Sequence, residues 1–190
     1  MKATDILMEE HRVVERVLTS LDEAADRMGR GGEMRPEFFM DAAQFIRGFA
    51  DGCHHKKEEG VLFEKMVASG MPRDAGPIAA MLADHEQGRA YTRAMDAAAR
   101  KLAAGDATAR QAVVDNARGY AALLRQHIRI EDTVLFPLAN RVIPLSAQDD
   151  VAEGFERVEH QETGEGVHEK YLALAESLER ESLVKPVLRR

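Results

Sequence analysis

The sequence lacks the features that several classes of protein require. Its 190 residues include one cysteine and no tryptophan, and only 5% are aromatic. The single cysteine, Cys53, excludes an intrachain disulfide framework and suits a reducing compartment. No apolar run approaches the ~20 residues of a membrane span, and the N-terminus has no apolar stretch typical of a signal peptide. We therefore predict a soluble, cytoplasmic protein.

The charge balance argues against nucleic acid as a partner. Acidic residues outnumber basic ones, and the formal net charge at pH 7 is −7. Nonspecific binding to nucleic acid needs a basic face, and the basic tail at 185–190 is short. We expect no nucleic-acid partner and no membrane partner, and the sequence identifies no protein partner.

The composition and the spacing of apolar residues predict an all-α fold. The hydrophobic residues, 45% of the chain, are rich in Ala, Leu, Val and Met, which favours helix over strand. Apolar residues recur every three or four positions in four stretches. These stretches predict helices at about 5–28, with Thr4 as N-cap, and at about 36–69, 77–104 and 106–137. The joins are short, so we predict an up-down antiparallel four-helix bundle.

A further helical segment follows the four stretches. It begins at about Ala147, with Ser146 as its expected cap, and is interrupted at Gly164 and Gly166. Its charged run between 156 and 169 is typical of a solvated face. We therefore divide the chain into a bundle at 1–145 and a C-terminal helical extension at 146–190 that packs on the bundle.

Two segments separated by 73 positions repeat one pattern: His-x-x-x-Glu, an acidic residue, a spacer and Val-Leu-Phe. The first copy contains His54 and Glu58, and the second contains His127 and Glu131. Residues four apart on a helix project from the same face, one turn apart. Each copy therefore offers an imidazole and a carboxylate to one region. Two such pairs facing each other across a bundle are typical of dinuclear metal sites.

Single histidines interrupt the apolar stripes of the other two predicted helices. Counting ~1.5 Å per residue places them at the same end of the bundle as the repeated pairs. Buried carboxylates that face each other repel, and two divalent cations would remove this repulsion. A network of His–Glu hydrogen bonds without metal is the alternative. The candidate metal ligands are His11, His54, Glu58, His85, His127 and Glu131.

The ligand types narrow the choice of metal. Mixed imidazole and carboxylate ligation suits iron, zinc or manganese, whereas magnesium and calcium prefer all-oxygen sites. Four imidazoles and two carboxylates bring two negative charges to the metals, against about four in carboxylate-rich di-iron oxidases. Less negative charge stabilises high oxidation states less. We therefore expect ligand binding or iron handling rather than hydroxylation of C–H bonds.

The repeated motif, followed by Leu-Phe, resembles the hemerythrin-like family of HHE cation-binding domains over roughly residues 4–140. The resemblance implies a non-haem di-iron centre with an oxo or hydroxo bridge that can bind O₂ directly. It implies that Glu58 and Glu131 bridge the two irons. It also implies that the remaining ligands are imidazoles, from His11, His54, His85 and His127.

One ligand of the oxygen-carrying members is missing from the sequence. Those members have His-x-x-x-His on the third helix, whereas Met81 here precedes His85 by four positions. Water, Tyr120 or His168 would fill the gap. His55 lies about 100° around an α-helix from its neighbour, so we expect it to be exposed or outside the ligand set. Lys56 and Lys57 are expected at the surface.

Three functions follow from these features. The first is a di-iron protein that binds O₂, NO or peroxide, or handles iron. The second is an enzyme that acts on peroxide or nitric oxide or repairs iron centres, and here Cys53, next to the site, would be redox-active rather than a buried structural thiol. The third is an interaction bundle with a structural metal. The sequence assigns no catalytic residue and does not decide whether the protein is an enzyme.

Overall fold

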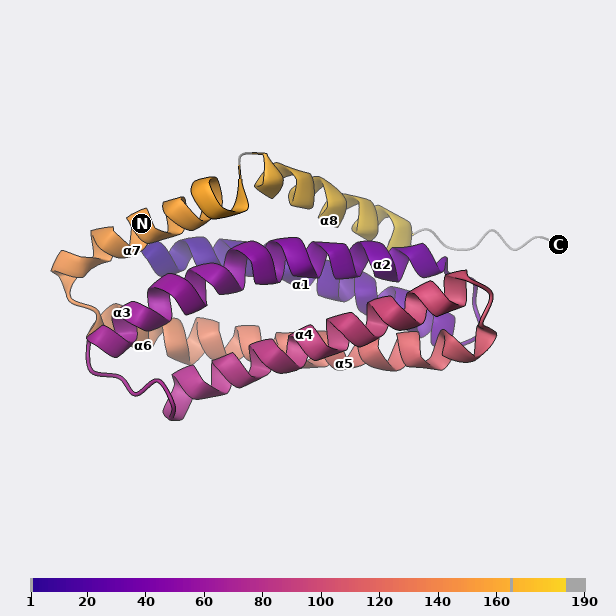
Figure 1. The fold of residues 1–190 in the computed structure, drawn as a ribbon, viewed down its shortest axis with the longest axis horizontal. Helices are drawn as coiled ribbons and strands as arrows, with labels where there is room; N and C mark the ends of the chain where they lie inside the picture. Colours follow the sequence, from indigo (N-terminus) through magenta and orange to yellow (C-terminus); the bar gives the residue numbers. More distant parts are fainter. Residues whose placement is uncertain (1, 165, 184–190) are drawn as a thin grey trace.

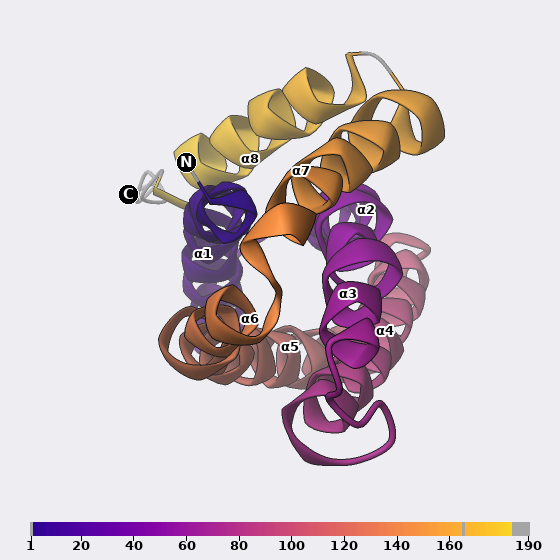
Figure 2. The same cartoon turned by 90° about the vertical axis from the view of Figure 1, so that its left-hand side faces the viewer.

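The computed structural model describes residues 2–164 and 166–183, and these contain helices and no strands. Four long helical rods run along the molecule (Figure 1). Viewed end-on, they surround a common interior (Figure 2). The first rod packs on the fourth, the fourth on the third, and the third on the second. This arrangement fits the four-helix bundle expected from the sequence.

The rods differ in how regular they are. The first and third are the uninterrupted helices α1 (Ala3–Gly29) and α4 (Gly76–Ala103). The second rod consists of α2 (Pro36–Phe45), the π-helical segments η1 (Ile46–His55) and η2 (Glu58–Leu62), and α3 (Phe63–Ala68). The fourth consists of the 3₁₀ turn η3 (Ala107–Ala109), α5 (Arg110–Ile130), the π-helical η4 (Glu131–Leu135) and α6 (Phe136–Val142).

The helices of the four rods begin and end within a few residues of the predicted positions, with two exceptions. These are the N-cap of the first helix and the end of the fourth rod. Lys2, not Thr4, is the N-cap of α1, and Asp5 accepts a hydrogen bond from the Lys2 backbone at 2.7 Å. Thr4 is buried inside the helix, where its hydroxyl accepts a hydrogen bond from Asn140 at 3.0 Å. Its side chain is therefore engaged between rods. The fourth rod continues past Pro137, because a proline near the start of α6 leaves the helix intact.

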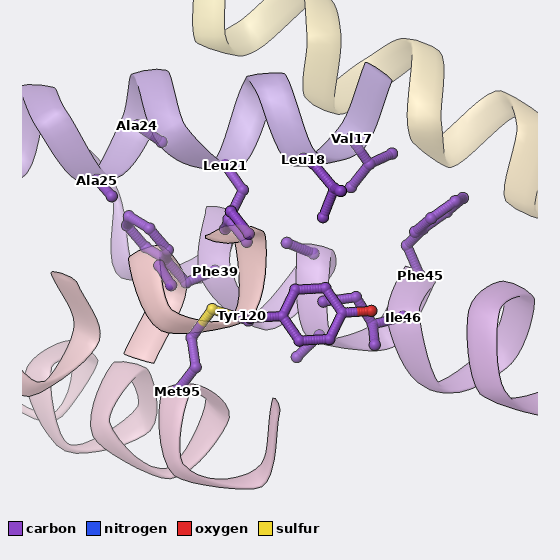
Figure 3. Close-up of a cluster of buried hydrophobic side chains, with 14 of the residues drawn as sticks. Val17, Leu18, Leu21, Ala24, Ala25, Phe39, Phe45, Ile46, Met95 and Tyr120 are labelled. Atoms are coloured by element: carbon purple, nitrogen blue, oxygen red, sulfur yellow. The ribbon is translucent and has the colours of Figure 1, made fainter. Parts of the chain in front are cut away.

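A polar layer separates two apolar clusters inside the bundle. The larger cluster includes Leu18, Phe45, Met95 and Tyr120 (Figure 3). The smaller one lies at the other end of the rods and includes Leu7, Leu62, Met81 and Leu135. Along each rod, the predicted metal ligands fall between these two groups. Burial of the apolar side chains on both sides therefore excludes solvent from the polar layer.

The C-terminal segment forms a hairpin against the bundle. It contains the 3₁₀ turn η5 (Leu145–Ala147), α7 (Gln148–Arg157), the π-helical η6 (Val158–Thr163) and α8 (Val167–Leu183). Ala147 rather than Ser146 is the N-cap of α7, because the 3₁₀ turn comes first. Gly164 has a φ of 103°, which lets the chain reverse. Helix α8 packs on α1 and α2 (Figure 2). The domain boundary at 145/146 stays a prediction.

None of the helices formed by the described residues combines the length and apolarity needed to cross a membrane.

A Gly48→Ala substitution tests how α8 packs. A Cβ at Gly48 in η1 would lie 1.8 Å from Cζ of Tyr171 in α8, so one of the two helices must move. Overpacking of this kind costs about 1–3 kcal/mol, and we expect that decrease in the free energy of unfolding. Gly60→Ala is the matched control, since nothing lies within 4 Å of its added Cβ. Equal denaturant midpoints for the two variants would contradict the packing.

Candidate metal centre

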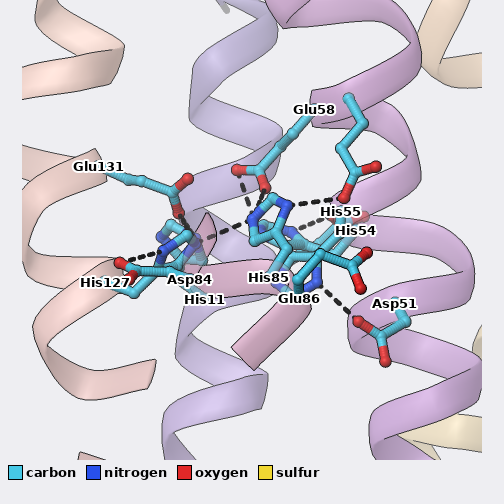
Figure 4. Close-up of polar contacts among 12 residues, drawn as sticks. His11, Asp51, His54, His55, Glu58, Asp84, His85, Glu86, His127 and Glu131 are labelled. Carbon is cyan, nitrogen blue, oxygen red and sulfur yellow. Dashed lines mark hydrogen bonds and ion pairs between the residues drawn. The ribbon is translucent and has the colours of Figure 1, made fainter. Parts of the chain in front are cut away.

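The six predicted ligands come together in the polar layer (Figure 4). They form two groups, and within each group the ligand atoms lie within 4.8 Å of one another. The first group is His11, His54, Glu58 and Glu131, and the second is His55, Glu58, His85 and His127. Each of these residues is at most 3% exposed. The repeated motif and the two lone histidines therefore meet at one place.

Glu58 belongs to both groups. Its Oε1 lies 3.4 Å from Nε2 of His54, and its Oε2 lies 3.4 Å from Nε2 of His85. One carboxylate therefore faces an imidazole of the first group with one oxygen and an imidazole of the second group with the other. This is the geometry of a bridging ligand between two cations.

Glu131 also joins the groups. Its Oε2 lies 3.2 Å from Nε2 of both His11 and His127, and Nε2 of His127 lies 3.1 Å from Nε2 of His85. With metal–nitrogen bonds of about 2.1 Å, neighbouring ligand atoms lie about 3.0 Å apart in an octahedral site and about 3.4 Å apart in a tetrahedral one. The observed separations match the edges of such a coordination polyhedron.

Six buried atoms in this layer have no hydrogen-bond partner among the described residues. They are Nε2 of His11, Nε2 of His54 and both carboxylate oxygens of Glu58 and of Glu131. Buried polar atoms in proteins are nearly always paired, and burying an unpaired charge is strongly unfavourable. Cations between these atoms would satisfy all of them, so the residues present fit a pair of metal ions.

Each imidazole is held by a carboxylate on its other nitrogen. The Nδ1 contacts are His11–Asp132 at 2.7 Å, His54–Glu10 at 2.9 Å, His55–Asp51 at 2.9 Å, His85–Glu59 at 2.7 Å and His127–Asp84 at 3.3 Å. Such partners fix the ring orientation and increase the basicity of the ligating nitrogen. In each of the five rings this leaves Nε2 as the nitrogen available to a metal ion. Four of the five carboxylates are adjacent in sequence to one of the predicted ligands. This adjacency is the signal from which sequence analysis could have predicted them.

His55 lies inside the site, so the expectation that it is exposed is wrong. Its ring is 3% exposed and stacks on His85 with the ring centroids 3.8 Å apart. The error comes from assuming an α-helix, because the chain is π-helical through His55 and a π turn holds about one more residue. The wider turn directs His54 and His55 into the bundle together. His55 thereby adds a fifth buried imidazole to the two groups.

Of the other residues considered for the missing position, His168 lies elsewhere. His168 belongs to neither ligand group and lies near Glu159, with its Nδ1 3.7 Å from Oε1 of that residue. Tyr120 is buried in the larger apolar cluster, and its hydroxyl has no hydrogen-bond partner among the described residues. Lys57, expected at the surface, is fully buried.

The pKa values of the side chains in the site result from two opposing effects: burial, and the charges of close neighbours. Burial disfavours protonation of His54 and His127, but Glu58 and Glu131 outweigh it and raise the pKa of each imidazole to about 10. Burial raises the pKa of Glu58, yet the neighbouring imidazoles hold that pKa well below its usual range. The pKa of His55 is well below its ordinary value, because burial and then His85 disfavour its charge. The carboxylates therefore favour the protonated form of His54 and His127 and leave His55 neutral.

Cys53 is a buried thiol beside the site. It is 2% exposed, and burial raises its pKa to about 11. A thiol that stays protonated is a poor nucleophile and oxidises slowly. This environment does not favour the redox-active alternative.

The chain belongs to the hemerythrin HHE cation-binding domain family, whose model matches residues 2–139. The match includes both ligand groups and ends before α7 and α8. Membership of this family supports binding of a metal cation, and the buried clusters of His and Glu are compatible with such binding.

Three curated relatives are each 31% identical to the chain over 163 residues. They are described as uncharacterized proteins of Mycobacterium bovis (strain ATCC BAA-935 / AF2122/97) and of Mycobacterium tuberculosis strains CDC 1551 / Oshkosh and ATCC 25618 / H37Rv. The alignments cover 86% of this chain but only 63% of each relative, so the chain spans less than two thirds of their length. No solved structure is significantly similar to the chain.

A His55→Ala substitution tests the fifth imidazole. We expect the affinity for the ion of the second group to fall at least about tenfold, since loss of an outer partner alone costs ~10–100-fold. Metal titration against a chromophoric chelator measures the change. His160→Ala is the matched control, because His160 is exposed. Equal affinities in the two variants would remove His55 from the ligand set.

Proposed function

We propose that the two groups hold two iron ions, bridged by Glu58 and Glu131, and that the protein binds O₂, NO or peroxide or handles iron. The observation that carries the proposal is the set of five buried imidazoles around two buried carboxylates: Glu58 belongs to both groups, and Glu131 contacts His11 and His127. A bound pair of irons supplies open coordination positions for a small ligand and a reservoir of electrons. Zinc and manganese also suit these donors. We place this function in the cytoplasm, which a single free cysteine suits.

The two groups offer different numbers of donors. With both carboxylates shared, the first group has two imidazoles, from His11 and His54, and the second has three. An ion that prefers six ligands therefore keeps more open positions in the first group. The ring of Phe136 stacks on His11 with the ring centroids 5.4 Å apart, which shields this side from water. We infer that a small ligand binds on the His11 side.

The charge around the site favours ligand binding over strong oxidation. The fifth imidazole is neutral, so the protein donors still bring two negative charges. Cations balance several of the outer carboxylates: Lys57 pairs with Glu10 at 2.5 Å and Arg89 with Glu59 at 2.6 Å. The outer shell therefore adds little negative charge with which to stabilise high oxidation states.

Metal content and the ultraviolet–visible spectrum of protein purified without added metal test the proposal. We expect about two irons per chain and near-ultraviolet bands that respond to O₂, azide or nitric oxide. Zinc alone, with no response after anaerobic reconstitution with Fe(II), would contradict it. Turnover of peroxide or nitric oxide with a reductant would favour the enzyme instead. Metal that only stabilises the fold, without response to these ligands, would favour the structural alternative.

A further inference from the structure

A third group of possible metal ligands lies outside the dinuclear site. It consists of Glu10, Cys53, Glu159 and His168, whose ligand atoms lie within 4.8 Å of one another. These residues come from α1, η1, η6 and α8, so the fold brings together parts of the chain that are distant in sequence. Glu159 and His168 belong to the C-terminal hairpin, beyond the residues that match the family. The group therefore joins two residues of the family domain to two residues of the hairpin.

The group lies beside a cavity of about 350 Å³ between the hairpin and the bundle, lined in part by Glu10, Phe49, Glu159 and His168. Glu10 is 5% exposed, whereas Glu159 and His168 are 30% and 27% exposed. Glu10 and Cys53 thus form the buried side of the group, and the two hairpin residues are reached from solvent. A cavity of this volume has room for a metal ion beside these residues.

The charges of the group favour a cation. The Lys57 ammonium donates hydrogen bonds to Oε1 of Glu10 at 2.5 Å and to Oε2 of Glu159 at 2.7 Å. Apart from His54, which contacts the other oxygen of Glu10, one positive charge faces two negative ones, and Glu9 at the cavity adds a third. His168 Nδ1 is buried and has no hydrogen-bond partner among the described residues. Carboxylate, imidazole and sulfur together suit zinc and similar divalent transition metals rather than calcium or magnesium.

We propose that Glu10, Glu159 and His168, with Cys53 as a fourth donor, bind a third divalent transition-metal ion in place of the Lys57 ammonium. The other oxygen of Glu10, Oε2, contacts Nδ1 of His54 at 2.9 Å. The third ion is therefore one carboxylate away from a ligand of the dinuclear groups, on their solvent side. The proposal does not depend on which metal the dinuclear groups hold.

Cobalt titration of the full chain, with its dinuclear groups already filled and counted by elemental analysis, tests the proposal. We expect one further Co²⁺ per chain and a thiolate-to-cobalt absorption in the near ultraviolet. Cys53→Ser should remove the absorption, and Glu159→Gln or His168→Ala should weaken binding at least tenfold. Glu156→Gln and His160→Ala are matched controls at exposed positions of the same hairpin. The metal content of the dinuclear groups reports whether each variant is folded.

A Lys57→Met substitution tests the proposal in the opposite direction, because it should increase the affinity for cobalt. Removing the competing ammonium should tighten cobalt binding at least tenfold, whereas a purely structural cluster would gain no affinity. No third cobalt, or cobalt binding that Glu159→Gln and His168→Ala leave unchanged, would overturn the proposal. Because the dinuclear metals are counted separately, this outcome is distinguishable from failure of the iron proposal.

Discussion

A Glu58→Ala variant is expected to lose metal from both ligand groups. Glu58 is common to the two groups, and its two oxygens face His54 and His85, one from each. Its removal takes away one donor from each ion and half of the negative charge that the protein brings to them. Loss of an outer partner alone costs ~10–100-fold in affinity, so we expect a larger decrease for each ion. Elemental analysis after dialysis measures the loss.

Glu64→Ala serves as the control for this experiment. Glu64 lies on the same rod, is exposed and pairs with Arg73 at the surface. It should retain the metal content of the unmodified protein. If Glu58→Ala also retained two ions, the carboxylate would not bridge them, and the assignment of the two groups as one centre would be wrong.

Metal removal is expected to lower the melting temperature by on the order of 10 °C. A ligand present at a thousand times its dissociation constant stabilises the folded state by about 4 kcal/mol. For a chain of this size, each kcal/mol corresponds to ~2–4 °C. Calorimetry of the loaded and chelated protein measures the difference. Chelator should change the melting temperature of Glu58→Ala much less, and an equal shift there would show that the stabilising metal is bound outside the two groups.

The effect of metal removal should grow with pH. Without metal, His54 and His127 have a pKa of about 10, above the ordinary 6.5, so their protonation stabilises the folded state. This contribution is complete below pH 6.5 and is lost as the pH rises towards 10. In the loaded protein, metal replaces these protons. The difference in melting temperature should therefore be larger at pH 9 than at pH 7, and a constant difference would contradict these pKa values.

The sequence identified most of the site because its residues obey α-helical spacing. His54 with Glu58 and His127 with Glu131 are four apart, and His11 and His85 interrupt regular apolar stripes. The burial of His55 could not be predicted, because no residue pattern indicates the π-helical turn that directs it inward. The position of His168 and the burial of Lys57 depend on how the hairpin packs. That packing brings Glu159 to the Lys57 ammonium across 102 positions of sequence, which helical periodicity does not encode.

The polar layer between the two apolar clusters affects how the protein unfolds. The clusters on its two sides draw on all four rods but meet through charged side chains. Regions separated by such a layer open with different free energies when little apolar contact crosses it. Metal ions bound by ligands from all four rods would link the two apolar clusters to each other. We therefore expect bound metal to decide whether the chain unfolds in one cooperative transition or in two.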